Sequence, residues 1–118
     1  MGQITLLAEI AIEPGRLAEF KSVVAEMVTA VQANEPGALR YDWYLSEDGT
    51  NDWNVEVFAD SQAVVEHMEN VADLVPKLQA TATFKRVEVL GDLSEEGMTA
   101  LGDLARSKLR RLGGVARP

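Results

Sequence analysis

The sequence predicts one α+β domain whose elements follow in the order strand, helix, strand, strand, helix, strand, with a further helix at the C-terminal end. Two observations predict this order. The spacing of apolar residues switches several times between the two-residue period of a strand and the 3.6-residue period of a helix, and Pro, Gly, Asn or Asp residues stand at the switches. A chain of 118 residues, 47% hydrophobic and 25% charged, has the size and balance of a single globular domain.

A change of period separates the first strand from the first helix. Residues 3–12 alternate, and the strand that this predicts has an apolar face of Ile4, Leu6, Ala8, Ile10 and Ile12. Pro14 ends the strand. From Arg16 onward the apolar residues recur at helical spacing and form a stripe of Leu17, Phe20, Val24, Met27, Val28 and Val31. Residues 34–37 end the helix, because Pro36 disfavours helical geometry in the residue before it.

Two strands joined by a tight loop are expected in the middle of the chain. Residues 38–46 alternate and are rich in aromatic residues, which is typical of a strand. One predicted face carries Leu39, Tyr41, Trp43 and Leu45, and the other carries Arg40, Asp42 and Tyr44. Gly49 lies within residues 47–51 and favours a hairpin loop, so residues 53–59 are the expected antiparallel partner strand.

A second helix and a last strand follow. Asp60 or Ser61 suits the N-cap of a helix that runs to about Val71. Pro76 predicts a kink or a new helical turn within residues 73–80. Residues 81–90 are then a strand, with Thr83, Lys85, Val87 and Val89 on one face and Phe84, Arg86, Glu88 and Leu90 on the other.

The C-terminal end has the pattern of an additional amphipathic helix. Ser94 can cap it, and acidic residues follow in the first turn, where they oppose the positive end of the helix dipole. An apolar stripe is formed by Met98, Leu101, Ala105, Leu109 and Leu112. We therefore divide the chain into a core domain of residues 1–92 and a helical extension of residues 93–118, which we expect to pack on the dimer described next.

The βαββαβ order describes a ferredoxin-like sandwich, a four-stranded antiparallel sheet with both helices on one face. The other face of the sheet is then bare. Because large exposed apolar patches are rare on soluble monomers, we expect a second copy of the chain to cover it. Two sheets packed in this way form a dimeric α+β barrel.

Composition excludes several classes of function. The chain has no cysteine, which rules out disulfides, thiolate metal sites and cysteine nucleophiles. The net charge of −8 repels phosphate backbones and anionic lipid, so neither nucleic acid nor membrane is an expected partner. No stretch is apolar enough to span a bilayer, and the N-terminus lacks a secretory signal pattern, so the cytoplasm is the expected location. The charge is uneven: residues 1–92 carry −10 and residues 93–118 carry +2.

Several short stretches resemble a known family. They are Ala8-Glu9-Ile10 before Pro14-Gly15, the run from Glu35 to Asp42, the run from Glu56 to Ala63, and His67. Together they are similar to the antibiotic biosynthesis monooxygenase family, over roughly residues 3–91. The resemblance implies a dimeric α+β barrel and places the chain near quinol and anthrone monooxygenases. It fixes the fold better than the reaction, because the wider superfamily contains other activities.

His67 is the only histidine and the candidate catalytic residue. Helical spacing places it on the apolar side of its helix, facing the sheet. It is either a core histidine held by one hydrogen bond, or a residue that lines a pocket and accepts a proton from a phenol or an activated methylene. The family resemblance supports the second interpretation, because the matching position often faces the pocket.

Aromatic and polar residues of the two central strands are candidates for substrate binding. Tyr41, Trp43, Trp53 and Phe58 could wall a flat ligand, although aromatic residues at strand spacing are more often core or dimer contacts. Asn54 and Arg40 could contact a carbonyl or oxyanion, and surface or interface hydrogen bonds are the alternative. Strand carboxylates such as Glu56 are expected to be solvated or paired, so we assign them no role.

The leading hypothesis is a cofactor-independent monooxygenase, or a related proton-transfer enzyme, that acts on an electron-rich aromatic, polyketide-like or quinol molecule. Such a substrate supplies its own electrons to dioxygen, so no cofactor is required, and a single histidine without cysteines does not favour a metal site. The alternative is a non-catalytic dimeric module that binds a small molecule or a partner. An RNA-binding domain of the same topology has the wrong charge and lacks the expected aromatic pattern.

Overall fold

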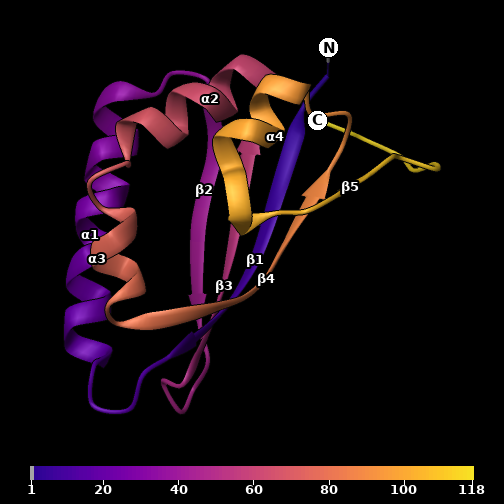
Figure 1. Cartoon of the computed structure of the whole chain (residues 1–118). Coiled ribbons are helices and arrows are strands. Elements are labelled where there is room, and N and C mark those ends of the chain that lie inside the picture. Colours follow the sequence, from indigo (N-terminus) through magenta and orange to yellow (C-terminus); the bar gives the residue numbers. More distant parts are fainter. Residues whose placement is uncertain (1) are drawn as a thin grey trace.

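The computed structural model describes residues 2–118, and Figure 1 shows their arrangement. The elements are β1 (Ile4–Ile12), α1 (Leu17–Asn34), β2 (Ala38–Leu45), β3 (Asn51–Phe58), α2 (Ser61–Asn70), α3 (Val75–Gln79), β4 (Ala82–Leu90), α4 (Glu95–Leu101), a short 3-10 turn (Gly102–Leu104) and β5 (Lys108–Leu109). The βαββαβ order of the α+β ferredoxin-like fold is confirmed. Within these residues no helix is both long enough and apolar enough to cross a membrane.

The sheet differs from the predicted four antiparallel strands. Its order is β2-β3-β1-β4-β5, and β5 pairs in parallel with β4, which makes the sheet five-stranded and mixed. The four longer strands are antiparallel to their neighbours, as expected. The short fifth strand adds an edge that the apolar periodicity gave no reason to expect.

The core lies between one face of the sheet and the helices. The predicted apolar face of β1 is confirmed, since all five of its residues are buried. From α1 the buried residues are Phe20, Val23, Met27 and Val31, so Val23 replaces the expected Val28, which is exposed. Alternation along a strand and helical spacing along α1 therefore bring two apolar surfaces together, which is the main source of stability for a domain of this kind.

Two bulges change which side chains face the helices. In β4 the pairing with β1 shifts between Glu9 and Ile10, so that Lys85 has no partner residue and Phe84 lies opposite Ile10. Phe84 consequently shares the helix-facing side with Val87, although simple alternation predicts opposite faces. A similar shift in β2 skips Leu39 and leaves Tyr41 opposite Glu56. Both bulges direct aromatic residues toward the helices.

The C-terminal extension is helical over only a part of its expected length. Ser94 is the N-cap, and its side chain accepts a hydrogen bond from the Gly97 backbone N–H, as predicted. The helix ends at Leu101 because Gly102 adopts φ 57° and ψ −130°, a combination that residues with a Cβ avoid. The structure therefore corrects the prediction of a helix reaching Leu112. Leu101 and the following Ala105 are buried against α2 and β4, whereas Leu112 is fully exposed.

Replacing Gly102 with alanine is expected to lower the free energy of unfolding by about 1–3 kcal/mol, because alanine must adopt a strained backbone conformation there. Urea denaturation measures this change. Gly113→Ala is the matched control: Gly113 has no positive φ, and no heavy atom lies within 4 Å of the place that an added methyl group would take. The control should stay within about 0.5 kcal/mol of the unmodified protein. Equal effects of the two substitutions would contradict the role given to Gly102.

Candidate active site

A small cavity lies between the helix-facing side of the sheet and helices α2 and α3. Its volume is about 40 Å³. Polar groups reach it from three elements: Tyr41 from β2, Glu56 from β3 and His67 from α2. The remaining lining is apolar and includes Phe84 from β4 and Leu104 from the C-terminal extension. A few convergent polar groups in an apolar cavity are typical of a ligand site.

The start of α2 sets the direction of His67. The Asp60 side chain accepts a hydrogen bond from the Ala63 backbone N–H at 2.9 Å and so caps the helix. With the helix beginning at Ser61, helical spacing places Ala63, Val64 and His67 on the buried side. His67 is only 4% exposed, so its ring is removed from bulk water.

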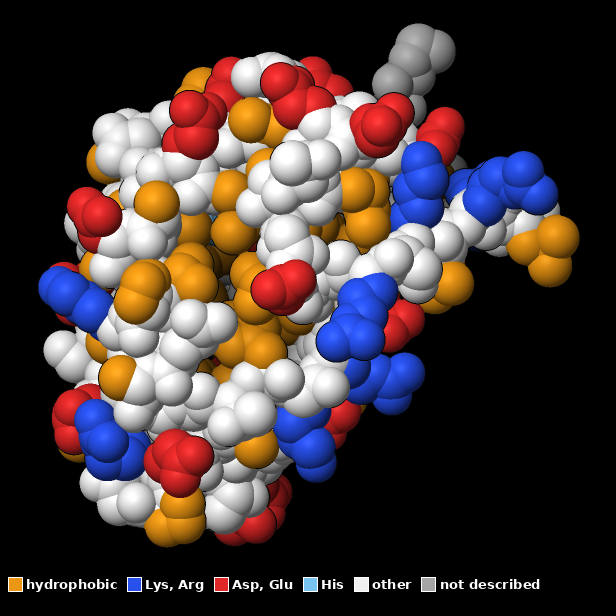
Figure 2. Space-filling model, viewed as in Figure 1, with side chains coloured by type: hydrophobic (Ala, Val, Ile, Leu, Met, Phe, Trp, Pro, Cys, Tyr) orange, Lys and Arg blue, Asp and Glu red, His pale blue; other side chains and the backbone are white. Residues whose placement is uncertain are grey.

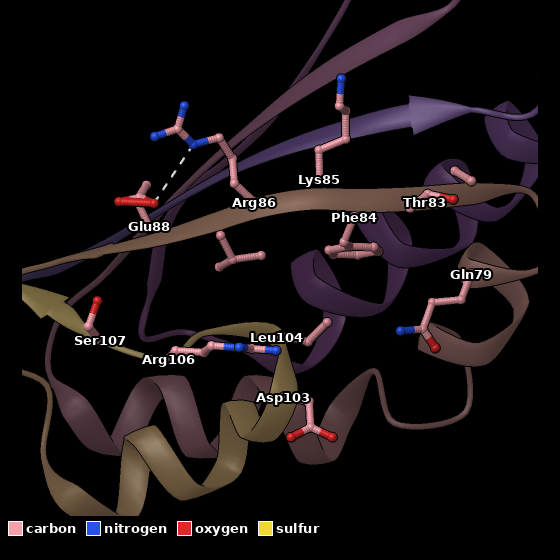
Figure 3. Close-up of a pocket in the computed structure, with 12 residues that line it drawn as sticks. Gln79, Thr83, Phe84, Lys85, Arg86, Glu88, Asp103, Leu104, Arg106 and Ser107 are labelled. Atoms are coloured by element: carbon pink, nitrogen blue, oxygen red, sulfur yellow. Dashed lines mark ion pairs between the residues drawn. The ribbon is translucent and has the colours of Figure 1, made fainter.

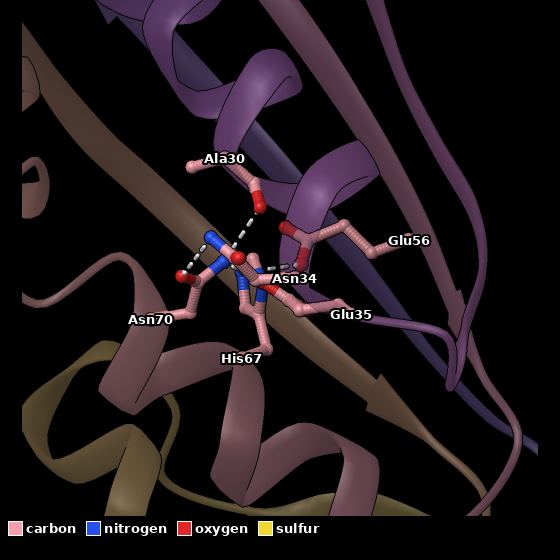
Figure 4. A network of polar contacts seen from close by, with 6 residues as sticks. All are labelled: Ala30, Asn34, Glu35, Glu56, His67 and Asn70. Carbon is pink, nitrogen blue, oxygen red and sulfur yellow. Dashed lines mark hydrogen bonds and ion pairs between the residues drawn. The ribbon is translucent and has the colours of Figure 1, made fainter.

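Two glutamates contact opposite nitrogens of the His67 ring (Figure 4). Nδ1 lies 2.9 and 3.0 Å from the two carboxylate oxygens of Glu35. Nε2 lies 3.3 Å from Oε1 of Glu56, which is within ion-pair distance. Among the described residues this Glu56 oxygen has no hydrogen-bond partner, so the contact is close but poorly aligned. Glu56 thus keeps acceptor capacity beside the cavity.

A second set of contacts holds Glu35 in place. Asn70 donates from Nδ2 to Oε2 of Glu35 at 2.7 Å and to the Ala30 carbonyl at 3.0 Å. Asn34 in turn donates to the Asn70 side-chain oxygen at 3.1 Å. Because Glu35 accepts the Asn70 hydrogen bond, the network favours a proton on Nδ1 of His67 that is donated to Glu35. Nε2 is then the ring nitrogen on the Glu56 side.

The turn after α1 brings Glu35 to this position. Glu35 is the C-cap residue of α1, and its backbone N–H donates to the Val31 carbonyl. A Cβ on Gly37 would lie 2.8 Å from the Cβ of Ala63, so only glycine allows the turn to approach α2 this closely. The sequence Glu-Pro-Gly therefore ends the helix and also presents a buried carboxylate to His67.

Burial and charge shift the acid–base properties of the site. Burial lowers the pKa of His67, but the hydrogen bond to Glu35 and the charges of Glu56 and Glu35 outweigh it, so that the pKa of His67 is raised. Burial raises the pKa of Glu56 to about 7. Burial also raises the pKa of Tyr41, which keeps its phenol protonated. Because the two side chains are in contact, the titration of Glu56 is coupled to that of His67.

Only some of the predicted substrate-binding residues lie together. The Tyr41 ring meets the His67 ring edge-on, with 5.3 Å between the ring centroids. The centroid of the Phe58 ring lies 5.1 Å from that of the His67 ring. Trp43 stands behind Tyr41 and does not line the cavity. Asn54 is buried, and its side chain donates to the Asp42 carbonyl, which gives it a structural role.

Arg40 and Trp53 lie on the opposite face of the sheet from His67. Trp53 pairs with Glu9 of β1 and Tyr44 of β2, whereas the helix-facing positions of β3 are Asn54, Glu56 and Phe58. Arg40 is exposed and bonds to Asp42 and Tyr44. Neither side chain can wall the cavity beside His67 in the same chain. Trp53 and Phe58 are five residues apart in the sequence, and this odd separation already places them on different faces of the sheet.

Sequence reasoning missed the two carboxylates. The sequence pattern indicates only a helix end at Glu35 and a solvated strand residue at Glu56. Glu56 did carry a signal, because it is two residues from Phe58, lies on the same face of its strand and so occupies a core position. Glu35 carried none, since its partner lies 32 residues away. In the described part of the chain no cluster of three or more His, Cys, Asp or Glu side chains is arranged to hold a metal ion.

Comparisons with known proteins place this fold. The sequence model of the antibiotic biosynthesis monooxygenase family matches residues 3–82. MupZ from Pseudomonas fluorescens is 24% identical, with a TM-score of 0.84 over 100% of this chain and 97% of that chain. SnoaB, a cofactor-independent oxygenase from Streptomyces nogalater, is 20% identical, with a TM-score of 0.67 over 80% of this chain and 96% of its own.

A third similar structure is Rv0793 from Mycobacterium tuberculosis, 23% identical, with a TM-score of 0.66 over 80% of this chain and 98% of that chain. At these identities the structural likeness establishes the fold. No protein with a curated function matches the sequence. The family match covers well over half of the 118 residues and includes β1, the Glu35 turn, β3 and α2. The chain therefore belongs to the antibiotic biosynthesis monooxygenase family.

Proposed function

We propose that this chain is a cofactor-independent monooxygenase, or a closely related proton-transfer enzyme, that acts on an electron-rich aromatic, polyketide-like or quinol small molecule. The observation that carries the proposal is the buried His67 held between Glu35 and Glu56 at the wall of an apolar cavity. Membership of the family supports the reaction class, and the similar SnoaB is a cofactor-independent oxygenase.

In the proposed reaction the His67–Glu56 pair removes a proton from a phenol or from a methylene next to a carbonyl. Glu35 stabilises the imidazolium through Nδ1 and holds the ring in position. The resulting electron-rich anion reduces dioxygen. For an activated methylene, one oxygen atom becomes the new carbonyl oxygen and the other leaves as water with the two methylene hydrogens, and the methylene carbon supplies all four electrons that reduce dioxygen. The apolar cavity keeps bulk water from the intermediate.

Oxygen uptake tests the proposal. The purified chain is supplied with a panel of anthrones and hydroquinones, and the rate is compared with that of His67→Ala. We expect a rate at least about 100-fold lower in the variant, because general acid–base catalysis contributes about that much or more. Glu66→Gln, one residue away on the exposed side of α2, is the control and should keep the full rate. Equal rates for His67→Ala and the unmodified chain would remove His67 from the reaction.

A non-catalytic binding module remains the second interpretation, and the small volume of the cavity favours it. A cavity of about 40 Å³ holds only about two or three water molecules. Calorimetry and oxygen uptake are measured with the same compounds between pH 6 and 9, a range that covers the titration of Glu56 at about pH 7. Binding without oxygen uptake would support this interpretation.

We also propose that the chain is a homodimer joined through the open face of the sheet. That face carries exposed apolar side chains, among them Tyr44, Trp53 and Leu90. Val55 and Leu7 pair near its centre. An apolar face of this kind is usually covered by another surface.

Light scattering of Val55→Glu tests the dimer. Glutamate at the centre of the interface would bury a charge without a partner, so we expect the variant to be monomeric while the unmodified chain is dimeric. Val28→Glu is the matched control, because Val28 is exposed on α1 and away from that face. Equal masses for all three proteins would contradict this interface.

A further inference from the structure

The cavity beside His67 is too small for the substrates that the proposed function requires. A single aromatic ring needs a cavity of roughly 150 Å³. The volume of the cavity here is about 40 Å³. A substrate with its reactive ring next to His67 must therefore push a wall aside or extend beyond it.

A larger groove lies directly behind one wall of this cavity. It has a volume of about 720 Å³ and runs between β4 and residues 103–107. Phe84, Val87 and Leu104 line both the groove and the cavity, so these three apolar side chains form a wall between them. Figure 2 shows a hollow with apolar side chains at its base on this side of the molecule. Leu104 is the one member of the wall that does not belong to β4, since it is the last residue of the short 3-10 turn Gly102–Leu104.

The charges around the groove are arranged asymmetrically (Figure 3). Lys85 and Arg86 are among the residues that line the groove, but their charged ends extend to the far side of β4, and Nε of Arg86 lies 3.8 Å from Oε1 of Glu88. The Asp103 carboxylate points away from β4. The Arg106 guanidinium lies in the groove, and within residues 2–118 it has no ion pair or side-chain hydrogen bond. The groove therefore offers an apolar base and, at Arg106, a cation whose donors are free and lie within it.

We propose that this groove is the outer part of the substrate site and that the substrate is an elongated molecule with a carboxylate at the end remote from the reacting ring. The ring enters the cavity by displacing Leu104, the connecting chain lies on Phe84 and Val87, and Arg106 binds the carboxylate with paired N–H donors. The inference rests on the proposed function, since it takes the cavity beside His67 as the reaction site.

The C-terminal extension, residues 93–118, forms one side of the groove. The family match ends at residue 82, whereas Leu104, Arg106 and most of β4 come after it. The extension thus supplies both the movable wall and the cation. The extension also places positive charge beside the acidic residues 1–92. A carboxylate would be repelled by the rest of that acidic surface and attracted to Arg106.

Calorimetry with 2-naphthylalkanoic acids of two to eight chain carbons, and with their methyl esters, tests the inference without requiring turnover. We expect affinity for the acids to rise with chain length until the carboxylate reaches Arg106. Arg106→Gln should weaken binding of the best acid about tenfold and leave its methyl ester unchanged, because one charge-assisted contact is lost. Arg117→Gln, an exposed arginine of the same extension, is the matched control and should bind as the unmodified chain does.

Two substitutions test the wall. Leu104→Trp should weaken the acid and the ester alike by filling the passage, and Leu104→Ala should bind both at least as tightly as the unmodified chain. Acid affinity that is independent of chain length, or of Arg106, would overturn the inference, as would unchanged binding in Leu104→Trp. Arg106-dependent binding of the acids, together with no oxygen uptake from the panel of anthrones and hydroquinones, would contradict the proposed reaction while supporting the groove, so the two failures are distinguishable.

Discussion

Glu56→Gln is expected to lower the rate of substrate oxidation by about 100-fold or more, which would make Glu56 as important as His67. Glutamine keeps the size of the side chain and removes its ability to accept a proton. Glu56 is the carboxylate that faces the cavity, contacts Nε2 of His67 at 3.3 Å and has an oxygen without a hydrogen bond in the described chain. Those three properties are what a group that exchanges protons with a bound ligand requires.

The pH profile distinguishes this role from a structural one. The pKa of Glu56 is raised to about 7, so the rate of the unmodified chain should rise as the pH passes through about 7 and the pair loses its proton. The hydrogen bond to Glu35 and the charges of Glu56 and Glu35 raise the pKa of His67; in Glu56→Gln one of these charges is absent, so the residual activity should titrate at lower pH. Glu9→Gln, on the opposite face of the sheet, should keep both rate and profile.

A stopped assay of initial rates from pH 5 to 9, a range set to bracket the raised pKa of about 7, measures both effects. A Glu56→Gln rate within about threefold of the unmodified chain would show that the proton goes to His67 or to solvent, and Glu56 would then be a structural partner only. An unchanged pH midpoint with a reduced rate would likewise argue against titration of Glu56.

Periodicity predicted the elements of this fold well because each depends on nearby residues. β1, α1 and the hairpin around Gly49 follow from local apolar spacing and turn residues. The parts that differ depend on pairing between strands. A bulge opposite Glu9 and Ile10 turns Phe84 toward the helices, and β5 forms only because β4 offers an edge. No local pattern records either event.

The candidate site also has one residue that a local pattern reveals and two residues that it does not. His67 could be found because it is the only histidine and has a clear helical position. Its function as part of a pair could not, since Glu35 and Glu56 reach it from a turn and a strand that are distant in sequence. A carboxylate at a core position of a strand is the one signal that could have been used, and two residues of β3 have it: Glu56 and Asp52.

Asp52 leads to the second large expected effect, on stability. It is 2% exposed, it lies opposite Ile10 on the helix-facing side of the sheet, and its Oδ1 has no hydrogen-bond partner among residues 2–118. Burial raises its pKa from 3.8 to about 7. A carboxyl group with a raised folded-state pKa stabilises the fold below its unfolded pKa and loses that contribution as the pH rises through the folded value. Asp52 should therefore weaken the fold progressively between about pH 4 and 7.

Asp52→Asn should remove this penalty. Asparagine resembles the protonated acid, so the variant should match the unmodified chain near pH 4 and exceed it by up to about 4 kcal/mol at pH 8, the value that follows from a change from 3.8 to about 7. Urea denaturation at the two pH values measures the difference. Asp48→Asn in the adjoining hairpin is the control of opposite sign, because hydrogen bonds from Thr50 and Ser46 lower the pKa of Asp48 and stabilise its charged form. A gain for Asp52→Asn that is equal at both pH values would mean that the buried carboxyl stays neutral throughout, and that packing rather than charge limits stability at this position.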